Sequence, residues 1–218
     1  MTKSRLSPEM EGAAAHRYAR VRGTESQLAA WRADADRLTA VGGDILEIAP
    51  GPGYLTVELA RRGARVSALD ISHTFAGMVR ERAVREQVTV DVRQGDAAAM
   101  PFNDCSFDVI ICQAAFKNFL HPVEALNEMR RVLRPGGVAM IEDLDPHASR
   151  ARIAAEVGGM RLSGGKALST RLILGWLRRR AHTPARLKEL AHESHFTRYD
   201  VARCGTIGLR LTLKKETA

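Results

Sequence analysis

The chain has 218 residues, of which 45% are apolar and 27% are charged, and its formal net charge at neutral pH is +8. These proportions are typical of a soluble globular domain and exclude a largely disordered chain, a fibrous repeat and a bundle of membrane helices. The length predicts one domain over residues 1–218. Only 5% of the residues are aromatic, which argues against a surface of stacked rings for single-stranded nucleic acid.

The excess positive charge lies towards the C-terminus. Residues 1–146 contain 18 basic and 20 acidic side chains, whereas residues 147–218 contain 15 and 5. The excess includes the run Arg178, Arg179 and Arg180, a pattern that can steer an anionic substrate, an acidic partner, a membrane surface or nucleic acid. For any single basic residue, a solvated surface position is the simpler interpretation.

The cysteines and the N-terminal sequence indicate the cellular compartment in which the protein is expected. Cys105, Cys112 and Cys204 are too few for a disulfide framework, and none belongs to a C-x-x-C pair, so we expect no metal site and no cysteine chemistry. The N-terminal residues lack the apolar run of a signal peptide, and no stretch approaches the ~18 apolar residues of a membrane span. We therefore expect a cytoplasmic protein without a membrane span, and the oligomeric state stays open.

The first part of the chain predicts helices followed by a strand and a tight turn. Apolar residues of 26–40 recur at steps of three and four, so residues 1–40 are expected to form an N-terminal helical cap. A buried strand is predicted over 44–49. It stops at Pro50-Gly51-Pro52-Gly53, and a helical pattern follows through Leu55 and Leu59.

The rest of the chain continues the alternation of strand and helix. Further strands are predicted over 65–70, 88–94, 107–112 and 138–144, with helices over 72–86 and 123–133. Residues 146–181 break into short helical pieces and are expected to form a lid or substrate-recognition insertion. A helix starting at Thr183-Pro184 precedes strands over 199–204 and 207–214 that are close enough to pair. The predicted fold is α/β, with a doubly wound, mostly parallel seven-stranded sheet and a C-terminal antiparallel hairpin.

Glycine and acidic residues gather where the first three strands end. Gly51 and Gly53 allow the backbone to approach a ligand closely at the carboxyl end of a parallel sheet. Glu47, in the first strand, suits a cationic ligand group better than a phosphate. Asp70 is placed to accept hydrogen bonds from both hydroxyls of a ribose, and Asp96 from an adenine amino group. Together they describe a ligand with adenosine at one end and a positive charge at the other.

These segments resemble the motifs of class I S-adenosylmethionine-dependent methyltransferases, and the resemblance covers residues 45–144 and the final hairpin. The similar stretches are 46–53, 66–70, 95–102, 107–110 and 130–137. One departure is Ala49-Pro50, where many members have glycine and a small residue. Ala115-Phe116-Lys117-Asn118-Phe119 is similar to the corresponding segment of quinone-biosynthesis and related small-molecule methyltransferases.

The resemblance implies a Rossmann-like fold, S-adenosylmethionine as cofactor, and methyl transfer to a small organic acceptor. The residues expected to bind the cofactor are Glu47, Ala49, Gly51, Gly53, Asp70, Ile71, Asp96, Ala97, Gln113 and Tyr18. The Asn/Asp-Pro-Pro-aromatic box of enzymes that methylate base amines is replaced by Gln113-Ala114-Ala115-Phe116, which disfavours nucleic acid as a partner. Two alternatives remain, namely methylation of RNA or protein through the basic C-terminal region, and a non-catalytic nucleotide-binding module.

A general base is optional for this chemistry because the methyl group is already activated on a sulfonium. If the acceptor is a hydroxyl, the candidates are His147, His121 and Asp143, which are all predicted near the carboxyl ends of strands. The simpler interpretation of each histidine is a helix-start residue at 121 and a loop residue at 147.

Overall fold

The computed structural model describes residues 10–160 and 162–217. Its seven strands form one sheet in the order β3-β2-β1-β4-β5-β7-β6. They are β1 (Asp44–Ile48), β2 (Arg65–Asp70), β3 (Val90–Gln94), β4 (Phe107–Gln113), β5 (Leu133–Leu144), β6 (Arg198–Cys204) and β7 (Gly208–Lys214). The first five are parallel, and β7 runs antiparallel to both β5 and β6. The predicted sheet and its terminal hairpin are confirmed.

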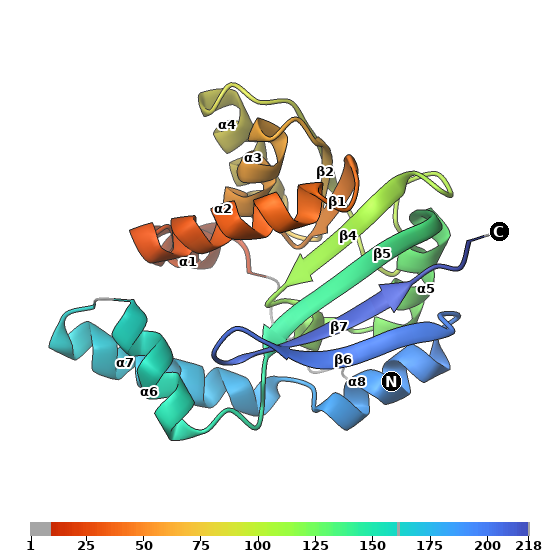
Figure 1. Ribbon diagram of the computed structural model, residues 1–218. Helices are drawn as coiled ribbons and strands as arrows, with labels where there is room; N and C mark the ends of the chain where they lie inside the picture. The colour runs from red at the N-terminus through yellow and green to blue at the C-terminus, as the bar shows by residue number, and fades with distance from the viewer. Residues whose placement is uncertain (1–9, 161, 218) are drawn as a thin grey trace, which may run out of the picture.

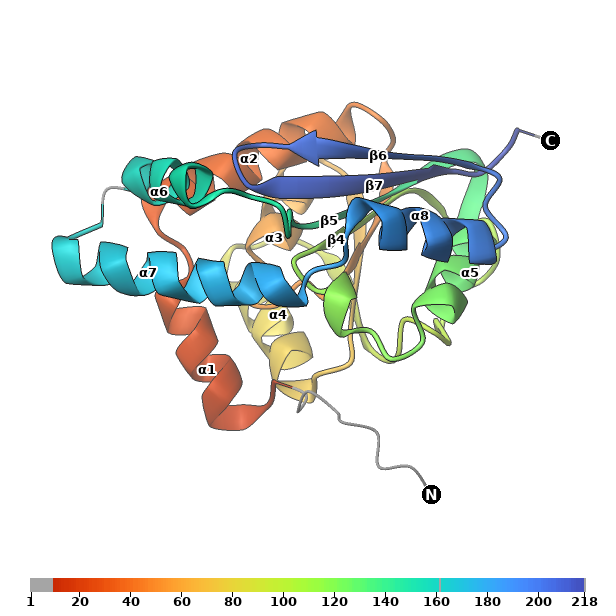
Figure 2. The ribbon, with the colours of Figure 1, turned by 90° about the horizontal axis from the view of Figure 1, so that it is seen from below.

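The described helices connect the strands and flank the sheet. They are α1 (Gly12–Val21), α2 (Glu25–Thr39), α3 (Tyr54–Arg61), α4 (His73–Arg85), α5 (Pro122–Val132), α6 (Arg150–Gly159), α7 (Gly164–Leu177) and α8 (Pro184–Glu193), with short 3-10 turns at Phe116–Asn118 and Arg178–Arg180. Seen from below in Figure 2, α2 lies on one side of the sheet and α5 and α8 lie on the other. None of these helices is long and apolar enough to cross a bilayer.

The two faces of the sheet bury separate apolar layers because successive side chains of a strand point to opposite faces. On β4, Ile110 and Cys112 join the layer that includes α5 and α8, whereas Val109 and Ile111 join the layer beneath α2 and α3. Strands buried on both sides read as continuous apolar runs, which is why 107–112 predicts a buried strand.

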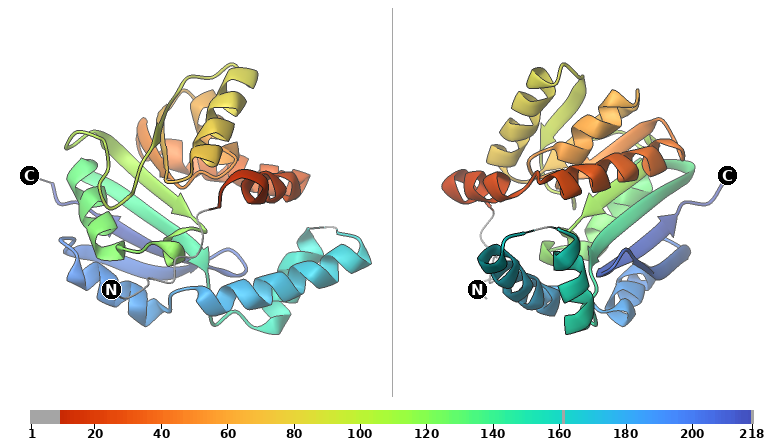
Figure 3. Two further views of the ribbon diagram at one scale, coloured as in Figure 1. Left: turned by 180° about the vertical axis from the view of Figure 1, so that it is seen from behind. Right: turned by 60° about the vertical axis from the view of Figure 1, so that its left-hand side comes forward.

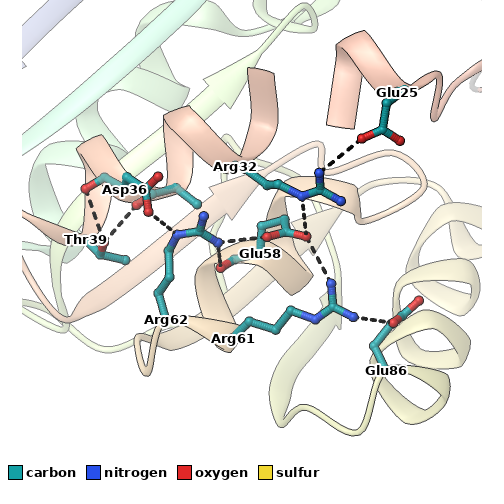
Figure 4. A network of polar contacts seen from close by, with 9 residues as sticks. Glu25, Arg32, Asp36, Thr39, Glu58, Arg61, Arg62 and Glu86 are labelled. Carbon is teal, nitrogen blue, oxygen red and sulfur yellow. Dashed lines mark hydrogen bonds and ion pairs between the residues drawn. The ribbon is translucent and has the colours of Figure 1, made fainter. Parts of the chain in front are cut away.

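Ion pairs tie the helices of one face together (Figure 4). The Arg62 guanidinium joins Asp36 of α2, at 2.5 Å, to Glu58 of α3, at 2.8 Å. Arg61 bridges Glu58, at 3.0 Å, and Glu86, which follows α4, at 2.6 Å. The network fixes α2 against the helix that follows β1, so the N-terminal helices hold a defined place over the sheet.

The start of one predicted strand differs in the structure. Strand β5 begins at Leu133 rather than Val138, and its register with β4 shifts between Phe107 and Val109. Arg134 extends this strand by pairing with Asp44 and Asp108 at 2.7 Å each, contacts between distant segments that no local pattern reveals. Residues 146–181 contain two helices, as expected, and Gly164-Gly165 begins the second of them, α7.

Of the two segments expected to flank the site, residues 1–40 place α1 and residues 146–181 place α6 and α7 at the same edge of the sheet, whereas α2 covers one of its faces. Figures 1 and 3 show α1 and the α6–α7 pair beyond the carboxyl ends of β4 and β5. Residues 1–9 and Arg161 of these two segments lie outside the described residues. Between β1 and β4 the chain order reverses direction along the sheet, which is where open α/β sheets bind ligands.

Candidate functional site

A cavity of about 560 Å³ opens at the carboxyl ends of the parallel strands. Residues after β1, β2, β3 and β4 line one side of it, and residues of α1, α7 and the turn that follows α7 line the other. A second cavity of about 60 Å³ adjoins it and shares Tyr18, Arg22, Gly51 and Gln113. The larger volume suits a small-molecule ligand.

The turn after β1 brings backbone to the cavity. Ala49, Gly51 and Gly53 have φ angles of 55°, 55° and 77°, a left-handed conformation that favours glycine. Gly53 is the N-cap of α3, and a Cβ there would meet Val79 Cγ2 of α4 at 3.0 Å. Ala49 adopts this conformation with a side chain, which costs about 1 kcal/mol. Such strain is typical of functional sites, and Ala49 and Gly51 both line the larger cavity.

Glu47 lies under this turn with its carboxyl group buried; only 5% of the residue is exposed. Thr56 of α3 donates a hydrogen bond to its carboxylate at 2.5 Å, and Glu47 lines the smaller cavity. Burial raises the pKa of Glu47 to about 7, and the charge of Asp70 adds to the shift while the Thr56 hydrogen bond opposes it. The site therefore holds an acid that a cationic ligand group would ionise.

Asp70 ends β2 beside the same turn and lines the larger cavity. Burial raises its pKa to about 6, against the hydrogen bonds that backbone amides donate to its carboxylate, of which that from Ser72 measures 2.9 Å. Asp96 also lines the cavity but is exposed, and its Oδ1 accepts from the Ala98 amide at 2.9 Å. The two aspartates thus face the same space from neighbouring strand ends.

Most of the residues singled out from the sequence come together here. Eight of the ten line the larger cavity, namely Tyr18, Ala49, Gly51, Asp70, Ile71, Asp96, Ala97 and Gln113. Glu47 lines the smaller cavity, and Gly53 lines neither but shapes the turn. The Gln113 amide donates to Asp34 of α2 and to Glu142 of β5 at 2.9 Å each, so it also anchors the N-terminal helices over the strands.

The three candidate bases have different positions. His121 and His147 are exposed and line neither cavity. Asp143 is largely buried and pairs with the Lys117 ammonium at 2.8 Å; their side chains are 10% and 7% exposed. Lys117 lines the larger cavity and Asp143 does not.

Three residues near the cavities have no sequence signal that marks them as site residues. The guanidinium of Arg22 lies 5.5 Å from the Tyr18 ring centroid and 5.4 Å from that of Trp31, and Arg22 lines both cavities. His182 packs on Phe116, and its burial lowers its pKa. Lys117 lies within a segment that the sequence marks, but a lone lysine there predicts a solvated side chain. Only the fold reveals that this lysine is largely buried and ion-paired with Asp143.

Comparisons with known proteins agree with this geometry. Residues 46–141 match the family model described as a methyltransferase domain. A demethylmenaquinone methyltransferase from Deinococcus radiodurans is 33% identical over 123 residues, which are 55% of this chain and 51% of that protein. A ubiquinone/menaquinone biosynthesis C-methyltransferase from Ruegeria sp. is 36% identical over 104 residues, which are 46% and 42% of the two chains. This chain thus aligns with about half of the length of each relative.

The solved structure of an S-adenosylmethionine-dependent methyltransferase from Aquifex aeolicus has the same fold, with a TM-score of 0.69 at 15% identity, over 92% of this chain and 97% of that one. Residues 46–141 are thus similar to a methyltransferase domain, and the fold of the chain is the one seen in that S-adenosylmethionine-dependent methyltransferase. In sequence, about half of the chain is similar to methyltransferases named for menaquinone and ubiquinone biosynthesis.

Proposed function

We propose that this chain binds S-adenosylmethionine in the cavity at the carboxyl ends of β1, β2 and β3 and transfers its methyl group to a small organic acceptor. The observation that carries the proposal is the pair of buried carboxylates, Glu47 and Asp70, beside the Gly51 turn. Neither forms an ion pair with a cationic side chain of the described residues. A buried carboxyl without a cationic partner is costly, so both are better explained as ligand groups than as structural ones.

The residues present fit the two ends of this cofactor. Glu47 would hold its ammonium group, and the Arg22 guanidinium at the same small cavity would hold its carboxylate. Asp70 would accept hydrogen bonds from the ribose hydroxyls, while Asp96 and the Ala97 backbone would meet the adenine. The open backbone at Gly51 lets the ligand approach where a side chain would obstruct it.

Bound S-adenosylmethionine supplies a methyl group on a sulfonium, which needs no further activation. The remaining contribution of the chain is to orient the acceptor and to exclude water from it. Phe119, Leu144, Trp176 and Leu177 give the far side of the cavity an apolar lining that suits an organic ring.

We assign to Lys117 the role of binding the acceptor. Its ammonium is held at 2.8 Å from Asp143 and also donates to the Ala114 carbonyl, so its position at the cavity is fixed. A positive charge there would stabilise the ionised form of an acceptor hydroxyl, whose proton passes to solvent water before the methyl group is transferred. Asp143 acts as the positioning residue for this ammonium, and His121 and His147 have no role in the proposal.

Calorimetric titration with S-adenosylmethionine, S-adenosylhomocysteine and NAD tests the cofactor assignment. We expect the first two to bind and Asp70→Ala to weaken both by roughly 10- to 100-fold, because hydrogen bonds to a charged group contribute ~1.5–3 kcal/mol. Asp91→Ala, in the exposed part of β3, is the control and should bind as the wild type does. Binding of NAD without S-adenosylmethionine would instead support a nucleotide-binding module of another kind.

A panel of phenols, quinols and amines, incubated with S-adenosylmethionine, then tests the acceptor class. Formation of S-adenosylhomocysteine with one of these compounds, and with neither RNA nor protein, is the expected result. Methylation of RNA or protein alone would overturn the choice of a small acceptor while leaving the cofactor assignment intact.

A further inference from the structure

The exposed apolar side chains of the molecule are unevenly distributed. Nine large ones are exposed among the described residues, and four of them lie on α7: Leu168, Leu172, Ile173 and Trp176, with 59%, 67%, 55% and 56% of their surface exposed. Three others, Met10, Ile71 and Leu120, line the larger cavity. The remaining two, Val41 and Val84, lie elsewhere. Burial of apolar surface is the main favourable term of folding, so such a concentration indicates a surface that something else covers.

The exposed residues of α7 form a continuous stripe. Leu168, Leu172 and Trp176 follow one another at steps of four, which places them along one side of a helix. Ala167 and Leu174, from other positions of the same helix, pack against the buried cluster that contains Ile153 and Val157 of α6. The helix is therefore already held on α6, and its stripe has no partner in the described part of the chain.

Basic residues occur on α7 and directly after it. Residues 164–181 contain Lys166, Arg171, Arg178, Arg179 and Arg180 and no acidic residue. The guanidinium of Arg180 lies 5.3 Å from the Trp176 ring centroid. None of the five forms an ion pair with a described carboxylate. A helix that combines leucine and tryptophan with lysine and arginine has the composition of segments that lie in the interface of a bilayer.

The stripe also continues into the mouth of the cavity. Trp176 belongs to both, since it is exposed on α7 and lines the cavity together with Leu174 and Leu177 of the same helix. Figure 3 shows α7 extending outward from the same edge of the sheet as α1. A flat apolar surface pressed against the stripe would therefore meet the cavity entrance.

We propose that α7 and the arginines that follow it dock this protein on the surface of an anionic lipid bilayer, with the cavity mouth facing the membrane. Anionic lipid complements Lys166, Arg171, Arg179 and Arg180, which are exposed, and the acyl region accepts the apolar stripe. Nucleic acid would leave the leucines uncovered, and a second copy of the chain would bring like charges together. The docking itself needs no methyl transfer. If the proposed function holds, docking would let an apolar acceptor enter from the lipid.

Sedimentation with lipid vesicles tests this docking in the absence of methyl donor and acceptor. The protein should bind vesicles that contain phosphatidylglycerol and bind pure phosphatidylcholine vesicles at least tenfold less well. Raising the salt from about 0.1 M to about 1 M should weaken binding to the anionic vesicles because the Debye length falls from ~10 Å to ~3 Å. Arg171→Gln with Arg179→Gln should weaken it by roughly tenfold or more, since each cation near the membrane surface contributes about fivefold.

Two double variants test whether vesicle binding depends on the stripe or on exposed apolar side chains anywhere on the surface. Leu168→Gln with Leu172→Gln, at positions that do not line the cavity, should lower vesicle binding at least tenfold while circular dichroism and the melting temperature stay unchanged. Val41→Gln with Val84→Gln removes exposed valines elsewhere and should bind as the wild type does. Equal loss in both pairs would overturn the proposal, as would equal binding to the two vesicle types.

Two further results would assign the surface to another partner and overturn the proposal. One is a dimer in light scattering that Leu168→Gln with Leu172→Gln converts to a monomer, without vesicle binding. The other is salt-sensitive binding of a duplex RNA by a protein that ignores anionic vesicles.

Discussion

The burial of the Glu47 carboxyl is costly for the fold alone, and the ammonium group of the proposed ligand would explain it. A carboxyl with a pKa of about 7 in the folded chain and an ordinary value of 4.5 in the unfolded chain is protonated more easily when folded. Between these pH values the folded state therefore binds more protons, and stability falls as the pH rises. Above pH 7 the charged group costs on the order of 3 kcal/mol of stability, which a ligand cation would offset.

We therefore expect Glu47→Gln to make the chain more stable at pH 8 and nearly unchanged at pH 4, because the neutral amide avoids the cost of burying a charge. The same variant should bind S-adenosylmethionine roughly 10- to 100-fold more weakly. Melting temperatures at the two pH values and calorimetric titration measure the two effects. Glu58→Gln is the control, since Glu58 is ion-paired to Arg62 at 2.8 Å and its loss should bring no gain at pH 8. Lower stability of Glu47→Gln at pH 8 would show that Glu47 is structural.

The ion pair of Lys117 and Asp143 has two proposed effects, on the stability of the fold and on methyl transfer, and variants can separate them. Lys117→Met leaves a buried carboxylate without its partner and should destabilise the chain by about 3–5 kcal/mol, whereas adding Asp143→Asn should recover much of that loss. Both the single and the double variant should lose methyl transfer while cofactor affinity stays unchanged. Denaturant unfolding, titration and turnover of the acceptor found in the panel give the three values. Recovery of turnover in the double variant would show that the Lys117 ammonium stabilises the fold but has no role in methyl transfer.

At the scale of the element, the turn from β1 into α3 is the part of the site that the backbone builds. Gly53 combines a left-handed φ of 77° with close approach to Val79, whereas Gly63, after α3, has a φ of 82° and open space around it. Replacing each glycine by alanine therefore distinguishes the free-energy cost of the left-handed backbone from the cost of placing a Cβ against a neighbouring side chain.

Gly63→Ala should cost about 1 kcal/mol, the conformational term alone. Gly53→Ala should cost about 1–3 kcal/mol more, because its Cβ must displace Val79 or shift α3 against α4. Since α3 carries Thr56, which donates to Glu47, Gly53→Ala should also weaken cofactor binding. Equal free energies of unfolding for the two variants would contradict the role of the α3–α4 contact.

At the scale of the whole molecule, the apolar interior is unevenly divided. The clusters on the two faces of the sheet contain the large buried side chains of β1, β4 and β5, whereas α6 and α7 pack on a separate small cluster of Ala148, Ile153, Val157 and Ile207. A segment with few buried contacts opens at a lower free energy than the core.

We expect backbone amides of α6 and α7 to exchange with deuterium orders of magnitude faster than those of β4 and β5. Saturating S-adenosylhomocysteine should slow exchange in α1 and in the residues after β1, which line the cavity, by more than it slows exchange in α5. Hydrogen exchange followed by mass spectrometry on peptides of the full chain measures both. Uniform exchange across α6, α7 and the central strands would show that the segment belongs to the core.

The sequence predicts much of this fold because its signals are local. Strand β2 and helix α4 follow from an apolar run and from Ser72, which caps the helix by accepting from the Phe75 amide. The early start of β5 has no local signal, because Arg134 is held by Asp44 and Asp108 from distant parts of the chain. Likewise, the register that brings Ile48 beside Leu69 and Cys112 depends on packing rather than on any short motif.

For the candidate site, the carboxylates and glycines at the strand ends can be predicted from the sequence alone, because their positions after apolar runs define one edge of a parallel sheet. Only the tertiary structure decided that Lys117 faces the cavity while His121 and His147 do not. It also decided that Arg22 joins Glu47 at the small cavity and that the stripe of α7 lacks a partner. The physical reason is that strand ends are fixed by local periodicity, whereas burial and exposure of a side chain depend on segments far away in the sequence.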